Sequence, residues 1–354
     1  EEPAVELELT TRVRESHRSF HHACVAAVSS GDAVNVWVAH KNLPVRVYRD
    51  EGGGLKLLKD FYEATYPRSG PGGKAGQAPP QRCLGFSRVD VHRPSGDVYV
   101  SDTFQNCFRI ADWDQPRLVR CMFDPKTRVP ALDVAFGPAG RRMYALGYKA
   151  WAAPVRRYRL EGERFAPDPL AGREGPAIAP RLMVGWKIGI GQFNSGFDMG
   201  PGGGLVALTS TKAKKQRGFI LSGFRVDSAE PLWGLPEFGR KPSGCVRFDR
   251  AGNLYVGLAD RKPEDIPAGF EDDRDYARSI GRIRKYAPTA EDAEGLRFPK
   301  APAEPERTYE VHFGHLDGRP AQFDVDGYGR IYYPTSIAQK VGVIDNAGNR
   351  IVRF

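Results

Sequence analysis

The sequence predicts an all-β protein, a six-bladed β-propeller with four-stranded antiparallel blades and long insertions between strands. Two observations support this fold class. A unit made of an apolar strand, a tight turn with Gly and a second β-branched or aromatic strand recurs six times in the 354 residues. The chain also holds 40 Gly and 28 Pro, which is typical of short strands joined by tight turns. We therefore interpret residues 1–354 as a single propeller domain.

Each repeat unit is recognised by its strand–turn–strand pattern. The units contain, in chain order, CVAAVSSGDAVNVWVAH, VDVHRPSGDVYVSDT, LDVAFGPAGRRMYALG, FDMGPGGGLVALTS, CVRFDRAGNLYVGLAD and FDVDGYGRIYYPTS. Their turn glycines are Gly31, Gly96, Gly140, Gly203, Gly252 and Gly329. Successive turn glycines lie 44 to 77 residues apart, and a propeller blade needs roughly 40–50 residues. The longer intervals therefore contain insertions.

A third strand, and usually a fourth, follows each pair, as VRVYRD and LKLL follow the first pair. A single blade would expose two apolar faces, so neighbouring blades on both sides must cover them. We expect blades near residues 20–60, 84–123, 130–168, 182–235, 240–300 and 308–354. We expect the second strands to contain Trp37, Tyr99, Tyr144, Leu208, Tyr255 and Tyr332.

Three insertions and the N-terminal segment interrupt this pattern. Residues 64–82 are rich in Pro, Gly and basic side chains, which predicts a mobile loop. Residues 161–194 form a long crossover, and residues 260–281 include a short predicted helix at Asp272–Ser279. The N-terminal run VELELTTRV alternates like a strand and is a candidate to clasp the last blade. Long loops on a rigid scaffold are common places for binding residues.

Composition and charge limit the function classes. No stretch approaches about 18 uninterrupted apolar residues, so we expect no membrane-spanning helix. The formal net charge is +9, but the basic residues are scattered, and the densest group is expected in one solvated loop. This basic loop comprises Lys212, Lys214, Lys215 and Arg217. The chain has no initiator Met and no signal peptide, so we interpret it as a mature or excised part of a longer protein. We expect a monomeric domain, with a secreted or periplasmic location favoured.

Three segments resemble the NHL-repeat family of β-propellers: GDVYVSDTFQNCFRI, PSGCVRFDRAGNLYVGLAD and FDVDGYGRIYYP. Each is similar to the family pattern of an aspartate, a turn, a Gly and an apolar-Tyr-Val strand often followed by Asp. The second and fifth units match best, and the first, third and fourth have only the turn and the strand. The resemblance implies the fold without one function, because the family spans scaffolds, RNA binders and metal-dependent lyases and hydrolases.

Enzymes of this wider fold group hold a divalent metal in the central channel through side chains of several blades. Asp90, Asp133, Asp198 and Asp324 each lie between apolar residues in an innermost strand, and such carboxylates suit a hard cation such as Ca²⁺. They precede their turn glycines by five to seven residues, so their register is not uniform. The alternative is structural, with each carboxylate accepting hydrogen bonds from backbone N–H groups of the adjacent blade. Cys24 and Cys245 are further candidates to line the channel.

Other candidate residues lie outside the predicted channel. The segment YEVHFGHLDG brings Glu310, His312 and His315 close together in sequence. On an extended strand the first two would share one face, a spacing suited to joint metal ligation. The alternative is that they are surface or packing residues. Cys107 and Cys121 flank a predicted hairpin that turns near Asp114, so they could form a disulfide or be two small buried side chains.

Three function classes remain open from the sequence. The first is a non-catalytic scaffold that binds a protein, peptide or glycan through loops at one face. The second is a metal-dependent lyase or lactonase-type hydrolase with a Ca²⁺ or Zn²⁺ ion in the channel. The third is an RNA-binding propeller with a basic, aromatic surface. No nucleophile elbow, P-loop or dinucleotide fingerprint occurs, so no catalytic residue is assigned.

Overall fold

The computed structural model confirms an all-β chain, with no helix among the residues that it describes. These residues lie, with short gaps inside several ranges, within 24–60, 86–123, 131–169, 194–235, 246–258, 280–298, 304–320 and 323–353. That part of the chain contains no helix long and apolar enough to cross a membrane. The predicted clasp VELELTTRV, the predicted loop at 64–82 and the predicted helix Asp272–Ser279 lie outside the described residues.

Six four-stranded antiparallel sheets follow one another along the described chain. The first contains β1 (Cys24–Ser30), β2 (Ala33–His40), β3 (Leu43–Asp50) and β4 (Leu55–Asp60). The second contains β5 (Phe86–His92), β6 (Asp97–Asp102), β7 (Asn106–Ala111) and β8 (Arg117–Phe123). The third contains β9 (Ala131–Phe136), β10 (Arg142–Gly147), β11 (Val155–Glu161) and β12 (Arg164–Pro167).

The remaining three sheets repeat the same order. The fourth contains β13 (Asn194–Met199), β14 (Gly204–Lys212), β15 (Arg217–Arg225) and β16 (Pro231–Leu235). The fifth contains β17 (Val246–Phe248), β18 (Leu254–Leu258), β19 (Ile280–Tyr286) and β22 (Arg307–His312). The sixth contains β25 (Asp324–Val325), β26 (Ile331–Pro334), β27 (Val341–Ile344) and β28 (Arg350–Arg353). Two minor hairpins pair β20 (Ala290–Glu291) with β21 (Arg297–Phe298), and β23 (His315–Leu316) with β24 (Arg319–Pro320).

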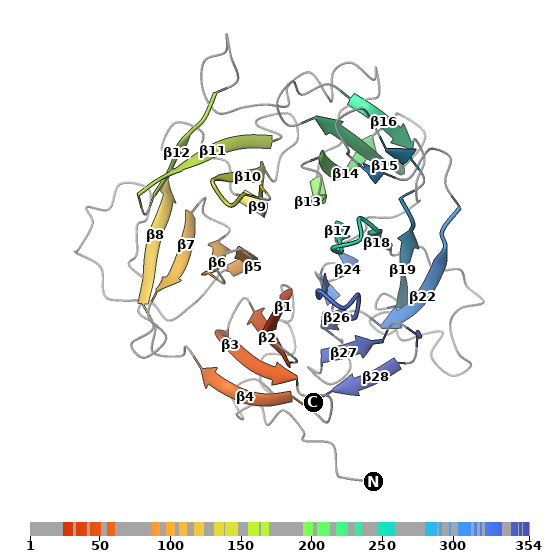
Figure 1. Cartoon of the computed structure of the whole chain (residues 1–354), viewed down its shortest axis with the longest axis horizontal. Coiled ribbons are helices and arrows are strands. Elements are labelled where there is room, and N and C mark those ends of the chain that lie inside the picture. The colour runs from red at the N-terminus through yellow and green to blue at the C-terminus, as the bar shows by residue number, and fades with distance from the viewer. Residues whose placement is uncertain are drawn as a thin grey trace.

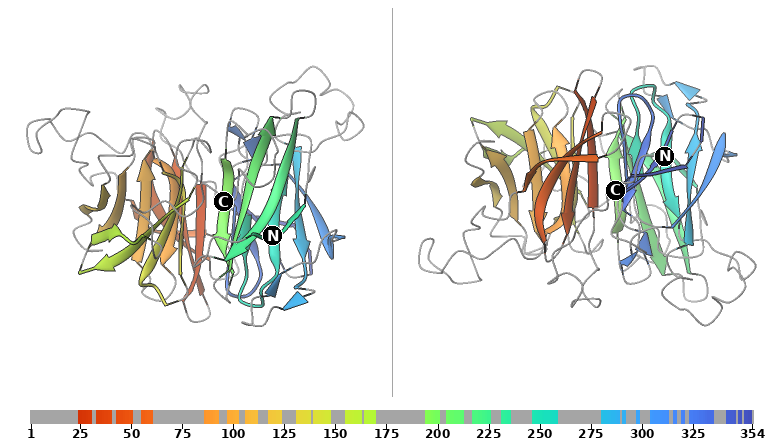
Figure 2. Two further views of the ribbon diagram at one scale, coloured as in Figure 1. Left: turned by 90° about the horizontal axis from the view of Figure 1, so that it is seen from above. Right: turned by 90° about the horizontal axis from the view of Figure 1, so that it is seen from below.

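The sheets are arranged around a common centre as a β-propeller (Figure 1). The first strand of each sheet lies nearest the centre, and the strands run through the thickness of the ring (Figure 2). Neighbouring first strands are in contact all the way round: β1 with β5, β5 with β9, β9 with β13, β13 with β17, β17 with β25, and β25 with β1. Because adjacent sheets cover each other, both faces of each sheet can be apolar.

The turn between the first two strands of a sheet depends on a glycine in the left-handed region. Gly140, Gly252 and Gly329 have φ values of 69°, 84° and 81°. Each of their N–H groups donates to the carbonyl three residues earlier, at distances between 2.8 and 3.2 Å. Residues with a Cβ rarely adopt this conformation, which explains why Gly occurs at these three turns. Gly31, Gly96 and Gly203 lie outside the described residues.

The second strand of each sheet contains the residue expected there, in β2, β6, β10, β14, β18 and β26. The five aromatic side chains among them are at most 4% exposed. They fill the seams between sheets: Tyr99 packs against Met143 and Tyr158 of the third sheet, and Tyr255 packs against Phe323 and Ile331 of the sixth. Burial of an aromatic side chain of this size contributes about 1.5–3 kcal/mol, so these residues stabilise the ring as well as each sheet.

One strand belongs to a different sheet from the one we expected. We placed the last unit from residue 308, but β22 pairs with β19 and completes the fifth sheet, so this boundary is wrong. The reason is packing, because Tyr309 and Val311 of β22 join Ile283 of β19 in one buried cluster. The fifth unit, which we expected to extend to residue 300, has only the two-residue strand β21 near that end. The expected crossover at 161–194 likewise begins with strand β12.

The ring closes between the first and sixth sheets, each of which is a continuous segment among the described residues. Ala27 donates its N–H to Asp324 Oδ2 at 2.7 Å, and the Tyr332 hydroxyl donates to Asp50 Oδ2 at 2.9 Å. Burial, followed by the negative charge of Asp50, raises the pKa of Tyr332, so its hydroxyl keeps the donated proton. A buried apolar cluster from both sheets surrounds these contacts.

Candidate functional site

A cavity of about 240 Å³ lies on the propeller axis. Its walls come from five of the six innermost strands and from the turns that follow them. The lining residues are Asp90, Val91, Val134–Gly137, Asp198–Gly200, Arg247–Arg250 and Asp324–Gly327. In each of these segments the lining begins in the strand, and in most it continues into the turn. The cavity therefore lies at the end of the axis where the hairpin turns between first and second strands gather; we call it the axial cavity.

The floor of the axial cavity is an ion triad of Arg247, Asp90 and Asp324. Arg247 Nε lies 3.2 Å from Asp324 Oδ1, and Arg247 Nη2 lies 3.5 Å from Asp90 Oδ1. Nη1 of the same side chain donates to the Val246 carbonyl at 2.7 Å. The three residues come from the fifth, second and sixth sheets, so the guanidinium reaches a neighbouring sheet and also one across the axis. Their side chains are only 4%, 12% and 7% exposed, so the charges attract each other with little screening.

Two aspartates join adjacent sheets through backbone hydrogen bonds. Asp324 Oδ2 accepts from the N–H of Ala27 in the next sheet, and Asp198 Oδ2 accepts from the N–H of Phe248 at 2.8 Å. In both pairs the donor is the corresponding residue of the next innermost strand. These are contacts of the structural kind that we expected as an alternative to metal binding. They fix the carboxylates at the seams and orient them beside the axis.

The rim of the axial cavity is held by aspartates that stabilise hairpin turns. Asp326 accepts from the backbone N–H groups of Tyr328 and Arg330, both at 2.9 Å, and from Arg330 Nε at 2.7 Å. Asp249 accepts from Asn253 and from the Tyr255 hydroxyl at 3.2 Å. Burial, followed by the charge of Asp249, raises the pKa of Tyr255, which keeps this hydroxyl a donor. Side-chain hydrogen bonds of this type fix the turn conformation.

The axial cavity has a negative lining in a positively charged chain. Five aspartates and two arginines contribute to its walls, whereas the whole chain has a formal net charge of +9. A concave, weakly solvated site concentrates such a local field. The cavity therefore disfavours anionic molecules more than the overall charge would indicate.

The sequence-predicted channel residues are placed differently from one another. Asp90, Asp198 and Asp324 line the axial cavity. Asp90 pairs with Tyr99 and Asp324 with Tyr332, but in the third sheet the residue that pairs with the aromatic Tyr144 is Ala135. Asp133 pairs instead with Leu146, two positions further from the turn. The side chains of Asp133 and Cys24, and the whole of Cys245, lie outside the described part of the chain.

The second candidate metal group lies at the outside of the ring. Glu310 is on β22, the outermost strand of the fifth sheet, and its side chain is 64% exposed. It forms an ion pair with Arg282, whose Nη2 lies 3.8 Å from Glu310 Oε1. His312 ends the same strand and His315 begins β23, but both side chains lie outside the described residues. Within the described residues, no group of three or more His, Cys, Asp or Glu side chains is arranged to hold a metal.

The remaining candidate residues lie on hairpins. In the predicted basic loop, Lys212 ends β14 and pairs with Arg217, which begins β15, whereas Lys214 and Lys215 lie in the undescribed turn between them. Cys107 on β7 pairs with Met122 on β8, and the register shifts next to Cys107. Cys121 is therefore a close neighbour of Cys107 in the backbone, and the disulfide stays a prediction.

Arg247 is the residue that the sequence analysis missed. It occupies, in the fifth unit, the position that Asp90, Asp198 and Asp324 occupy in theirs: VRF corresponds to VDV, FDM and FDV. The signal in the sequence was an arginine between apolar residues, at a repeat position where three other units have an aspartate. Such an arginine predicts an ion pair, because an isolated buried charge is too costly to retain.

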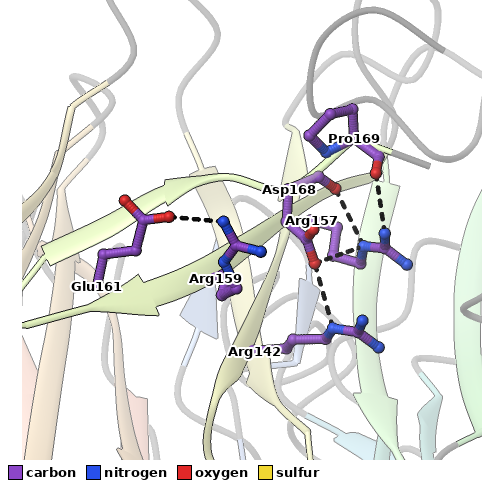
Figure 3. A network of polar contacts seen from close by, with 6 residues as sticks. All are labelled: Arg142, Arg157, Arg159, Glu161, Asp168 and Pro169. Carbon is purple, nitrogen blue, oxygen red and sulfur yellow. Dashed lines mark hydrogen bonds and ion pairs between the residues drawn. The ribbon is translucent and has the colours of Figure 1, made fainter. Parts of the chain in front are cut away.

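A second ionic cluster lies within the third sheet (Figure 3). Asp168 Oδ2 is 3.1 Å from Arg142 Nε and 3.0 Å from Arg157 Nε. Arg157 also donates to the carbonyls of Asp168 and Pro169, at 3.0 and 3.1 Å. On the same face of the hairpin, Arg159 pairs with Glu161 at 2.8 Å. All these residues lie on or directly after β10, β11 and β12, so the cluster stabilises one sheet.

Comparison with known proteins supports the fold. No protein-family model and no curated protein sequence matches the chain. Hydrazine synthase of Kuenenia stuttgartiensis is similar in structure, with a TM-score of 0.53 and 13% identity over 92% of this chain and 84% of that chain. The β-propeller domain of Cps50 (Swd1) of Myceliophteria thermophila has a TM-score of 0.50 and 12% identity over 94% of this chain and 85% of that chain. The chain is a β-propeller, and identities this low carry no information on function.

Proposed function

We propose that this chain is a six-bladed β-propeller, related in its repeats to the NHL-repeat family, that acts as a non-catalytic binding domain for a protein, peptide or glycan. The blade number is supported by the six four-stranded sheets and by the closed succession of innermost strands. The binding role is supported by the axial cavity, which lies at an open end of the ring and is walled by rigid strands and turns.

The observation that carries this proposal is the ion triad at the cavity floor. A metal-dependent propeller enzyme needs axial carboxylates that are available to a cation. Here Arg247 lies between Asp90 and Asp324 and supplies a permanent positive charge. A divalent ion at this position would be repelled by the guanidinium and would have to break its ion pairs. The axial acids are therefore better suited to holding the ring together than to metal catalysis.

The second candidate function, a channel-metal lyase or hydrolase with Ca²⁺ or Zn²⁺, has one observation in its favour. Asp90, Asp198 and Asp324 do line one cavity, and oxygen ligands from several strands suit Ca²⁺. The two candidate functions differ in the role of Arg247. In the binding domain Arg247 stays paired with Asp90 and Asp324, whereas in the metal enzyme it would have to move for these acids to share a metal ion.

Thermal unfolding with and without metal tests the proposal. The wild-type melting temperature should be the same in EDTA, in CaCl₂ and in ZnCl₂. Arg247→Ala removes the internal cation, so its melting temperature should be lower and should rise when CaCl₂ is added. Arg250→Ala, at the exposed rim, is the matched control, and its melting temperature should be the same in EDTA, in CaCl₂ and in ZnCl₂. If EDTA lowered the wild-type melting temperature and Asp198→Asn abolished that response, the metal enzyme would replace the binding domain.

A further inference from the structure

We infer that the axial cavity binds one neutral, hydroxyl-rich ring, of the size of a single sugar unit at the end of a glycan. This inference rests on the proposed binding function and narrows its ligand class. Three properties of the cavity carry it: a hydrogen-bond donor at the floor, carboxylates beside that donor, and a small volume.

The donor is Nη2 of Arg247. The residue is only 3% exposed and lines the cavity. Among the described residues Nη2 makes no hydrogen bond. Its ion-pair distance to Asp90 Oδ1 is 3.5 Å, beyond the usual hydrogen-bond range of about 2.7–3.2 Å. A buried donor without an acceptor is unfavourable. An oxygen atom of a ligand seated at the floor would supply the acceptor.

The neighbouring carboxylates decide which oxygen fits. Asp90 and Asp198 line the same cavity as Arg247, so a carboxylate or phosphate ligand would meet their negative charge. A hydroxyl group accepts one hydrogen bond and donates another. It can therefore accept from the guanidinium and donate to an aspartate at the same time, and adjacent hydroxyls on one ring can do so repeatedly.

The volume and the walls limit the ligand to one ring. The cavity measures about 240 Å³, less than the roughly 300–1,000 Å³ of pockets for drug-sized molecules. Apolar residues, Phe136, Met199 and Phe248 among them, also contribute to its lining. At the rim, a Cβ on Gly327 would lie 2.8 Å from Ser29 Oγ, so a larger residue there would disturb the contact between the first and sixth sheets.

Saturation-transfer NMR and titration calorimetry with D-glucose, D-galactose, D-mannose and D-glucuronate test this inference. At least one neutral hexose should bind, and D-glucuronate should bind at least tenfold more weakly than that hexose. Asp198→Asn removes a charge but keeps an amide oxygen for the Phe248 N–H, so it should weaken hexose binding and reduce the discrimination against D-glucuronate. Glu161→Gln, on the third sheet outside the cavity, is the matched control and should leave both affinities unchanged.

Three results would overturn the inference: no binding of any hexose, equal binding of D-glucuronate, or an Asp198→Asn variant that folds normally and binds as the wild type does. If EDTA does not change the wild-type melting temperature, these results would refute the sugar ligand but not the proposed binding domain. A wild type that is destabilised by EDTA would overturn the proposed function itself.

Discussion

The axial ion triad and the ionic cluster of the third sheet are opposite in composition. On the axis one arginine, Arg247, lies between two aspartates. In the third sheet one aspartate, Asp168, lies between two arginines (Figure 3). The axial residues come from three sheets, whereas the residues of the other cluster come from a single sheet. The first network therefore depends on closure of the ring, whereas the second needs only the strands β10, β11 and β12 of one sheet.

The two networks also differ in how completely each charge depends on its ionic partners. All three side chains of the triad are almost fully buried. In the third sheet the Arg142 side chain is 44% exposed, and Arg157 also donates to two backbone carbonyls. Water can thus replace the lost partner of Arg142, whereas the buried triad keeps its own backbone contacts, from Arg247 to the Val246 carbonyl and from the Ala27 N–H to Asp324. From this comparison we expect burial and the number of sheets joined, more than the number of ion pairs, to decide how much a network contributes to stability.

The largest expected effect is that of Arg247→Met. It removes the only cation of the triad and leaves two buried carboxylates from different sheets, so the free energy of unfolding should fall by about 3–5 kcal/mol. Urea denaturation followed by circular dichroism measures this change. Arg250→Met, at the exposed rim, should change the free energy by less than about 0.5 kcal/mol. A loss below about 1 kcal/mol for Arg247→Met would show that the triad does not hold the sheets together.

A smaller effect is expected from Asp168→Asn. The variant loses the negative charge between Arg142 and Arg157, but Arg157 keeps its hydrogen bonds to the carbonyls of residues 168 and 169. The free energy of unfolding should fall by about 1–2 kcal/mol in the same urea assay. If Asp168→Asn destabilised the protein as much as Arg247→Met, the difference between single-sheet and cross-ring networks would be refuted.

His92 gives a pH-dependent test at the seam between the second and third sheets. Its ring packs on Phe136 at 5.3 Å between centroids, and burial holds the pKa of His92 below its usual 6.5, with Asp97 opposing the shift. The folded state therefore binds this proton less readily than the unfolded state. This contribution to stability is present above about pH 6.5 and is lost as the pH falls through the lower folded-state pKa.

Thermal unfolding between pH 5 and 7 measures this contribution. The wild-type melting temperature should fall as the pH is lowered from 7 to 5. His92→Gln should reduce the slope of melting temperature against pH, even if the variant is less stable at every pH. An unchanged slope would show that His92 titrates alike in both states.

The smallest effect is expected for the exposed pair of Arg159 and Glu161. Their side chains are 58% and 53% exposed, and the pKa of Arg159 is raised by its hydrogen bond to Glu161 and by the charge of that residue. Surface pairs of this kind are screened by water and salt. Glu161→Gln should leave the melting temperature unchanged within error, at low and at high salt. A clear fall at low salt would mean that single-sheet pairs contribute more than their burial indicates.

Much of the fold could be predicted from the sequence because hairpins follow local rules. The glycine in the described turns, and the aromatic residue in five of the six second strands, are set by short-range geometry and by alternation. The boundary at β22 could not be predicted in this way. Whether Tyr309 and Val311 pack with the fifth or the sixth sheet depends on a partner strand more than twenty residues away in sequence, and both arrangements satisfy the same alternation.

By itself the sequence determined that this chain is built from strand–turn–strand units whose innermost strands carry aspartates. Only the tertiary structure decided what those aspartates do. The Ala27 N–H and Asp324 are 297 residues apart in sequence, and Arg247 meets Asp90 across the axis only once the ring has closed. The reason is that a turn is fixed by a few neighbouring dihedral angles, whereas the partner of a buried charge depends on which sheets come together around it.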